Sequence, residues 1–154
     1  MSPRPAATSP YATPGQWNSN EDFMRQHIGS VALVVRDYDE AKAWYCDKLG
    51  FDLVDDTPLP DGKRWLLIAP PGSTETRLLL AAAANPEQAS RIGNQTGGRV
   101  FLFLHTEDFW ASFHAMQAKG VHFCEEPRNE SYGTVAVFED LYGNRWDLLE
   151  LRAS

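Results

Sequence analysis

The chain has 154 residues, and its 14 Lys and Arg against 21 Asp and Glu give a formal net charge of −7. A chain of this length buries roughly 70% of its unfolded surface, so it needs no disulfide or structural metal to hold a core. The acidic balance and the lack of a Lys/Arg cluster argue against a nucleic-acid surface or an anionic-membrane patch. We expect no nucleic-acid partner.

The cysteine count and the length of the apolar runs argue against a disulfide-rich secreted protein and a membrane-spanning protein. The two cysteines, Cys46 and Cys124, exclude a disulfide-dense secreted scaffold and offer no CxxC spacing. The longest apolar run, residues 78–84, is far shorter than the roughly 20 residues that cross a bilayer. The N-terminus lacks the apolar stretch of a signal peptide. We therefore expect a soluble, cytoplasmic protein with no membrane partner.

Residues 1–26 are predicted to form an arm rich in Pro, Ala, Ser and Thr. Its first 20 residues contain four prolines and no Val, Ile, Leu or Phe, so they cannot build a core of their own. We expect this arm to be solvated or to rest against the body or a partner subunit. Tyr11 and Trp17 are its candidate anchors.

The segment 27–84 predicts a β-α-β-β-β module. Residues 28–35 are rich in β-branched side chains and indicate a buried strand. Asp37 with Glu40 three residues later predicts a helix N-terminus, and Gly50 predicts its end. Residues 51–57, 64–69 and 76–82 follow as strands, separated by turn-forming Pro and Gly.

The same order returns over residues 99–151, after a glycine-containing linker at 85–98. Asp108 matches Asp37 at an offset of 108 − 37 = 71, and Gly120 matches Gly50 at 120 − 50 = 70. The predicted strands of this half are 99–105, 121–124, 134–138 and 145–151. Neither half buries its sheet face alone, so we predict an α+β fold in which two tandem modules form a rolled mixed sheet around a cleft.

Residues 30–51 (SVALVVRDYDEAKAWYCDKLGF), the turn Lys119-Gly-Val, and residues 139–150 (EDLYGNRWDLLE) resemble the vicinal oxygen chelate superfamily, which includes glyoxalase I, bleomycin-resistance proteins and extradiol dioxygenases. The resemblance covers about residues 27–151. It implies the paired-module fold and, since bleomycin-resistance-like members commonly dimerise, a homodimer.

Enzymes of this superfamily use a divalent metal in the cleft as a Lewis acid, bound by His and Glu side chains. The resemblance maps these ligand positions onto Ser30, Phe101, Asp147 and the strand 76–82, where Leu78 to Leu80 offer no donor atom. A lone carboxylate and a hydroxyl do not replace two imidazoles for Zn, Ni or Fe. We therefore predict no metal cofactor, and a divalent metal only if the site has been rebuilt.

His105 is the residue from which such a site would be rebuilt, because it lies four residues after Phe101 on the same strand face and would enter the cleft alongside Asp147. The alternative is an end-of-strand histidine that is hydrogen-bonded to a loop. His27 falls on the opposite face, and His114 and His122 are expected at the surface. Acid–base catalysis by His105 and Asp147 without a metal is a further alternative. No nucleophile elbow is present, and acidic neighbours of Cys124 oppose its ionisation.

Strand alternation predicts a ligand site lined by residues from both halves, namely Ser30, Trp65, Phe101, Phe103, His105 and Asp147. Arg64, Arg128 and Tyr132 are polar candidates near its rim. Aromatic walls with one carboxylate suit a planar or cationic organic ligand. The favoured function is metal-independent binding of a small molecule. The alternatives are a filled core at Phe101 and Phe103, or a metal-dependent lyase or dioxygenase with a relocated site.

Overall fold

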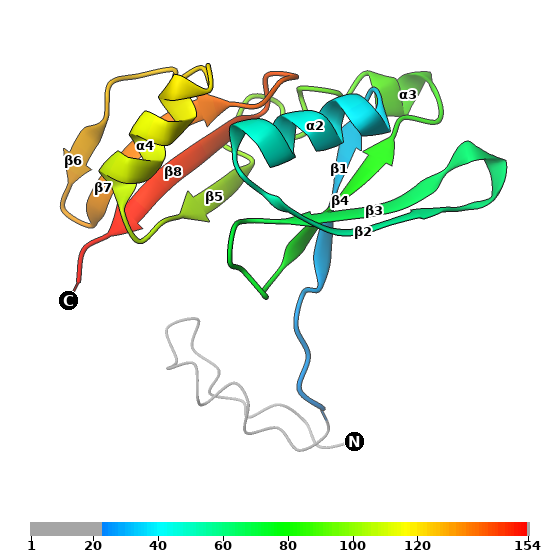
Figure 1. The fold of residues 1–154 in the computed structure, drawn as a ribbon, viewed down its shortest axis with the longest axis horizontal. Coiled ribbons are helices and arrows are strands. Elements are labelled where there is room, and N and C mark those ends of the chain that lie inside the picture. The colour runs from blue at the N-terminus through cyan, green and yellow to red at the C-terminus, as the bar shows by residue number, and fades with distance from the viewer. Residues whose placement is uncertain (1–22, 154) are drawn as a thin grey trace, which may run out of the picture.

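The computed structural model describes residues 23–153, and its elements repeat one order twice (Figure 1). Most of the predicted arm, with Tyr11 and Trp17, lies outside the described residues. The first module consists of β1 (Ser30–Val35), α2 (Tyr38–Lys48), β2 (Asp52–Pro58), the 3-10 turn η1 (Pro60–Gly62), β3 (Arg64–Ala69) and β4 (Arg77–Ala82). The linker carries a short helix, α3 (Pro86–Ala89), and the second module consists of β5 (Leu102–His105), α4 (Phe109–Ala118), β6 (Arg128–Glu130), β7 (Gly133–Glu139) and β8 (Arg145–Leu151).

The strands form two four-stranded mixed sheets with the same internal order, β1-β4-β3-β2 and β5-β8-β7-β6. The first and last strands of each module are parallel, β1 with β4 and β5 with β8, and the other pairs are antiparallel. The predicted α+β class and the tandem β-α-β-β-β modules are therefore confirmed.

Both long helices begin and end where the sequence predicts. The Asp37 carboxylate accepts from the Glu40 amide at 2.8 Å, and the Asp108 carboxylate accepts from the Ala111 amide at 3.1 Å. Each bond satisfies one of the amides that the first helical turn leaves without a partner. Gly120, which ends the second of these helices, has a φ of 87°, a backbone conformation that side chains with a Cβ disfavour.

The predicted strand at 121–124 is wrong, because the second strand of module two is β6. Phe123 makes only an isolated antiparallel bridge with Phe138 on β7. Beyond it, the Glu125 side chain accepts from the Val137 amide at 3.1 Å, in place of a backbone carbonyl. Pro127 then supplies no amide hydrogen for a ladder. The chain resumes pairing only at Arg128.

The helices α2 and α4 lie on the same side of the two sheets, where the core is formed (Figure 1). Residues of both modules meet there around Trp146. Its ring lies 5.9 Å from Tyr45 and 6.0 Å from Phe51, measured between centroids. The core is therefore continuous between the modules, and its contacts fix how the two sheets sit relative to each other.

A buried polar link reinforces this interface. The Tyr45 hydroxyl, on α2, donates to Asp140 in the β7–β8 turn at 2.6 Å. Asp140 also accepts from the amides of Tyr142 and Asn144, each at 2.9 Å, and from the Asn144 side chain at 2.9 Å. Burial, together with Asp140, raises the pKa of Tyr45 well above its usual value, so the phenol is the donor.

None of the helices within 23–153 has the length and hydropathy to cross a bilayer.

Candidate functional site

Each sheet has one face turned away from α2 and α4, and we call these two surfaces the open faces. On β5 and β8 the register places Phe103 opposite Asp147, and His105 opposite Leu149. All four side chains alternate with residues that pack against the core, such as Trp146 and Leu148. Phe103 is 59% exposed, so the helices leave this part of the sheet uncovered.

The first sheet has an open face of the same kind. Trp65 precedes the buried Leu66 on β3 and is 41% exposed. Ser30 lies at the start of β1, where the register pairs it with Arg77 on β4. The structure therefore places Ser30 and Trp65 on one open face, and Phe103, His105 and Asp147 on the other.

Phe101 is the member of the predicted group that lies elsewhere. It precedes the first residue of β5, is partly buried, and packs against the core. Its ring meets Trp146 edge-on, with centroids 6.3 Å apart. Strand alternation predicts the face of a residue only within the strand, and here the strand starts one residue later. For Phe101 the filled-core alternative describes the observed packing.

Asp147 is the polar centre of the second open face. Its Oδ1 atom is buried and has no hydrogen-bond partner among residues 23–153. Burial raises the pKa of Asp147, and Glu125 adds to this effect while Arg128 opposes it. Arg128 is itself held by Glu125 at 3.0 Å and by Glu130 at 2.7 Å. In the described part of the chain this oxygen is thus left without a bonded donor, which is unusual for a buried polar atom.

The positions that match the superfamily's metal ligands offer few donors. Ser30 contributes a hydroxyl and Asp147 a carboxylate. On β4, the strand that matches the fourth ligand position, Leu79 lies opposite Ala32, and neither side chain has a donor atom. His105 lies two ladder positions from Asp147, and the two side chains share no hydrogen bond among those formed within the described chain. Within residues 23–153 they are joined by no third His, Cys, Asp or Glu close enough to complete a ligand set.

Two of the predicted rim residues are already engaged in ion pairs. Arg64 alternates with Trp65, so it lies on the helix side, where its guanidinium pairs with Asp56 at 2.7 Å and stacks on Tyr38. Arg128 is held by its glutamates, as described above. Tyr132 is 49% exposed in the β6–β7 turn. Arg64 is therefore corrected from a rim residue to a structural one.

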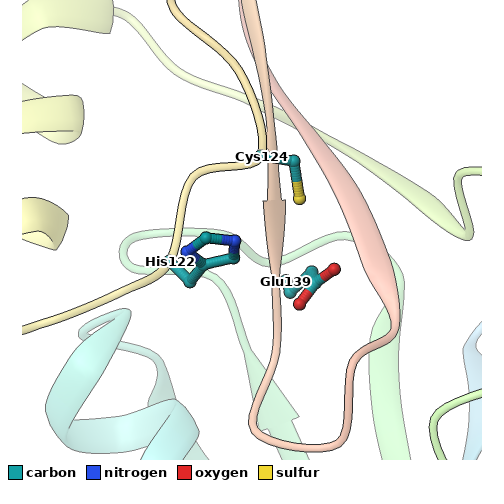
Figure 2. Close-up of side chains that lie close together, drawn as sticks. All are labelled: His122, Cys124 and Glu139. Atoms are coloured by element: carbon teal, nitrogen blue, oxygen red, sulfur yellow. The ribbon is translucent and has the colours of Figure 1, made fainter.

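A cluster that the sequence reasoning missed lies at the end of β7. His122, Cys124 and Glu139 bring their donor atoms within 4.8 Å of one another (Figure 2). The available signal was the alternation of His122 and Cys124 in an extended segment, which places both on one face. The pKa of Cys124 is raised, first by burial and then by Glu139, so the thiol is poorly suited to act as a nucleophile.

A separate pocket of about 320 Å³ is lined by the linker between residues 93 and 99, by the turn 143–145, and by Glu139. It contains none of the residues predicted for the ligand site. The Gln95 side chain accepts from the Val34 amide at 3.0 Å and donates to the Ala32 carbonyl at 2.6 Å, so this linker covers the free edge of β1.

Comparison with known proteins places this geometry in a family. The family model of the Glyoxalase/Bleomycin resistance protein/Dioxygenase superfamily matches residues 27–148. An uncharacterized protein of Shewanella frigidimarina (strain NCIMB 400) is 57% identical over 129 residues, covering 83% of this chain and 96% of the relative. The Bacillus subtilis (strain 168) protein YetH is 32% identical over 127 residues, covering 82% of this chain and all of YetH, 100%.

Solved structures agree with these matches. UcmS2 superposes with a TM-score of 0.72 at 33% identity, covering 82% of this chain and 98% of its own. TnmS3, an antibiotic binding protein from Streptomyces sp. CB03234, superposes with a TM-score of 0.69 at 32% identity, covering 84% and 99%. The family match, the repeated modules and the shared topology together make this chain a member of the glyoxalase/bleomycin resistance protein/dioxygenase superfamily.

Proposed function

We propose that this protein binds a small, planar organic cation on its open faces without using a metal there. The observation that carries the proposal is the Asp147 carboxylate, which lies opposite the exposed ring of Phe103 and whose buried Oδ1 has no partner among the residues that the structure describes. Asp147 is only partly buried, so a cationic donor would reach its carboxylate from the open face, and an aromatic ring would cover Phe103. Without a ligand, the unpaired Asp147 oxygen and the exposed Phe103 ring both destabilise the folded protein.

The donor set supports a site without a metal. At the positions that match the superfamily's ligands, the chain offers only the Ser30 hydroxyl and the Asp147 carboxylate. Structural and catalytic zinc sites use at least three protein ligands, mostly imidazole, thiolate and carboxylate. These residues do not fit a divalent metal, and we infer that the superfamily's ligands have been lost from this face.

Closure of the site requires a second surface. Trp65 and Phe103 are 41% and 59% exposed, and small-molecule sites bury most of their ligand. We infer a homodimer in which the first open face of one copy lies over the second open face of the other.

The relatives support binding rather than a particular reaction. TnmS3 is described as an antibiotic binding protein, and it shares the fold and 32% of its residues with this chain. Fold alone does not transfer function, so the open-face residues have to carry it. Both cysteines are free, which fits a protein that works in the reducing cytoplasm.

The test uses two dyes of nearly the same shape, 9-aminoacridine, which is a cation at neutral pH, and acridine, which is neutral. Isothermal titration of chelator-treated protein is expected to show tighter binding of the cation. Asp147→Asn should weaken 9-aminoacridine by roughly 10- to 100-fold, since a hydrogen bond to a charged group contributes about 1.5–3 kcal/mol, and leave acridine unchanged.

Two tryptophan variants locate the aromatic wall. Trp65→Ala is expected to weaken both dyes. Trp110→Ala is the matched control, because Trp110 is 50% exposed but stands on α4, away from the open faces. The proposal is contradicted if Asp147→Asn binds each dye as tightly as the wild type does. It is also contradicted if Trp110→Ala weakens binding while Trp65→Ala does not.

A further inference from the structure

The cluster at the end of β7 is built on a fixed backbone frame. Phe123 bridges Phe138, the Cys124 amide donates to the Val137 carbonyl at 2.8 Å, and the Glu139 amide donates to the His122 carbonyl at 3.0 Å. This short antiparallel pairing sets His122 directly opposite Glu139. Cys124 follows two residues along the same segment.

The core determines where the three side chains point. Phe123 packs into the core. The centroid of its ring lies 4.5 Å from that of Phe113 and 5.7 Å from that of Phe138. Side chains alternate along extended backbone, so the neighbours of Phe123 and Phe138 leave on the opposite side. His122, Cys124 and Glu139 therefore share one face, and Figure 2 shows their polar atoms directed toward one space.

The three donors form a set that is chemically distinct from an acidic cluster. One imidazole nitrogen, one sulfur and one carboxylate oxygen are the ligand types that Zn²⁺ takes, and all lie within 4.8 Å of one another. In a tetrahedral zinc site with bonds of about 2.0–2.3 Å, ligand atoms lie roughly 3.3–3.8 Å apart. Because His122 and Cys124 are exposed, side-chain rotation can supply the remaining contraction of about 1 Å.

The Glu139 carboxylate is engaged within the cluster itself, by a side-chain hydrogen bond with the Cys124 thiol. Arg145 lies opposite Glu139 on β8, yet no ion pair joins the two in the described part of the chain. At Cys124 the negative charge of Glu125 opposes the effect of Arg145 only in part. A thiolate, a carboxylate and a neutral imidazole together balance the two charges of the ion.

We propose that His122, Cys124 and Glu139 bind one Zn²⁺ per chain, with a fourth position left for water. This site lies at the end of β7 and includes neither Ser30 nor Asp147, so it differs from the metal position that the superfamily uses. It does not rest on the proposed small-molecule function, and either proposal can fail while the other stands.

The experiment starts from tag-free protein that has been stripped with a chelator and desalted. Titration with Zn²⁺, followed by elemental mass spectrometry after dialysis, is expected to give one zinc per chain. Co²⁺ in its place should produce the near-ultraviolet charge-transfer band of a thiolate–cobalt bond. Cys124→Ser should abolish that band and weaken zinc by more than about 100-fold, since loss of an outer partner alone costs 10- to 100-fold.

Matched variants separate this site from other donors. His122→Ala and Glu139→Gln should also weaken zinc, whereas Cys46→Ser, His114→Ala and Asp147→Asn should not. Circular dichroism of the metal-free variants checks that each is folded. Zinc retained by folded Cys124→Ser, zinc lost in Asp147→Asn, or no zinc bound by the wild type would each overturn the proposal.

Discussion

The bond between Tyr45 and Asp140 joins the two modules, and its removal has a magnitude that the structure defines. In Tyr45→Phe the 2.6 Å bond is lost, and Asp140 Oδ2 keeps only the Asn144 side chain at 2.9 Å. Tyr45 is fully buried, so water does not replace the hydroxyl. A hydrogen bond to a charged group contributes about 1.5–3 kcal/mol. We expect a loss of about 2 kcal/mol, or roughly 4–8 °C in Tm for a domain of this size.

Urea unfolding followed by circular dichroism measures this loss, with Tyr132→Phe as the control. Tyr132 is exposed, so its variant is expected to change stability by less than about 0.5 kcal/mol. A double-mutant cycle with Asp140→Asn isolates the pairwise energy. A change below about 0.5 kcal/mol in Tyr45→Phe would show that the bond does not hold the modules together.

Three further predictions follow from backbone geometry and charge. Gly93→Ala should lower the free energy of unfolding by more than about 2 kcal/mol, because its Cβ would lie 2.0 Å from a carbonyl oxygen of the β7–β8 turn. Gly97→Ala is the control, because its Cβ would enter open space, and it should lower that free energy by only about 1 kcal/mol. Thermal melting measures both variants. Arg64 lowers the pKa of Asp56 from 3.8 to about 2. The stability that their pairing gives is therefore full above pH 3.8 and is lost as the pH falls through about 2. The destabilisation caused by Asp56→Asn should shrink over the same pH range. Burial raises the pKa of Asp147 above 3.8, so ionisation destabilises the fold as the pH rises past that value, and Asp147→Asn should melt higher than wild type at pH 7 but equally at pH 3.

Much of the fold was predictable because its signals are local. Asp37 and Asp108 each bond an amide three residues away, so the helix starts depend on sequence spacing alone. The repeat then set the order of strands in both halves. The strand at 121–124 failed because its pairing is ended by the Glu125 side chain, which reaches the Val137 amide across the sheet. Such a long-range replacement of a backbone partner leaves no periodic trace in the sequence.

The positions of the candidate site residues in the sheets were predictable only where strand alternation holds. Phe103 and Asp147 share an open face because both lie inside paired strands. Phe101 lies just before β5, where tertiary packing against Trp146 decides its direction. The group of His122, Cys124 and Glu139 joins segments that are paired only in three dimensions, so sequence spacing relates His122 to Cys124 but not to Glu139.

Binding of 9-aminoacridine to chelator-treated protein tests the central claim most directly, with wild type and Asp147→Asn compared by isothermal titration at neutral pH. We expect saturable binding that is weakened roughly 10- to 100-fold by the substitution, because the carboxylate loses its charge. Binding that is unchanged in Asp147→Asn, or that appears only after a divalent metal is added, would contradict a metal-independent site on the open faces.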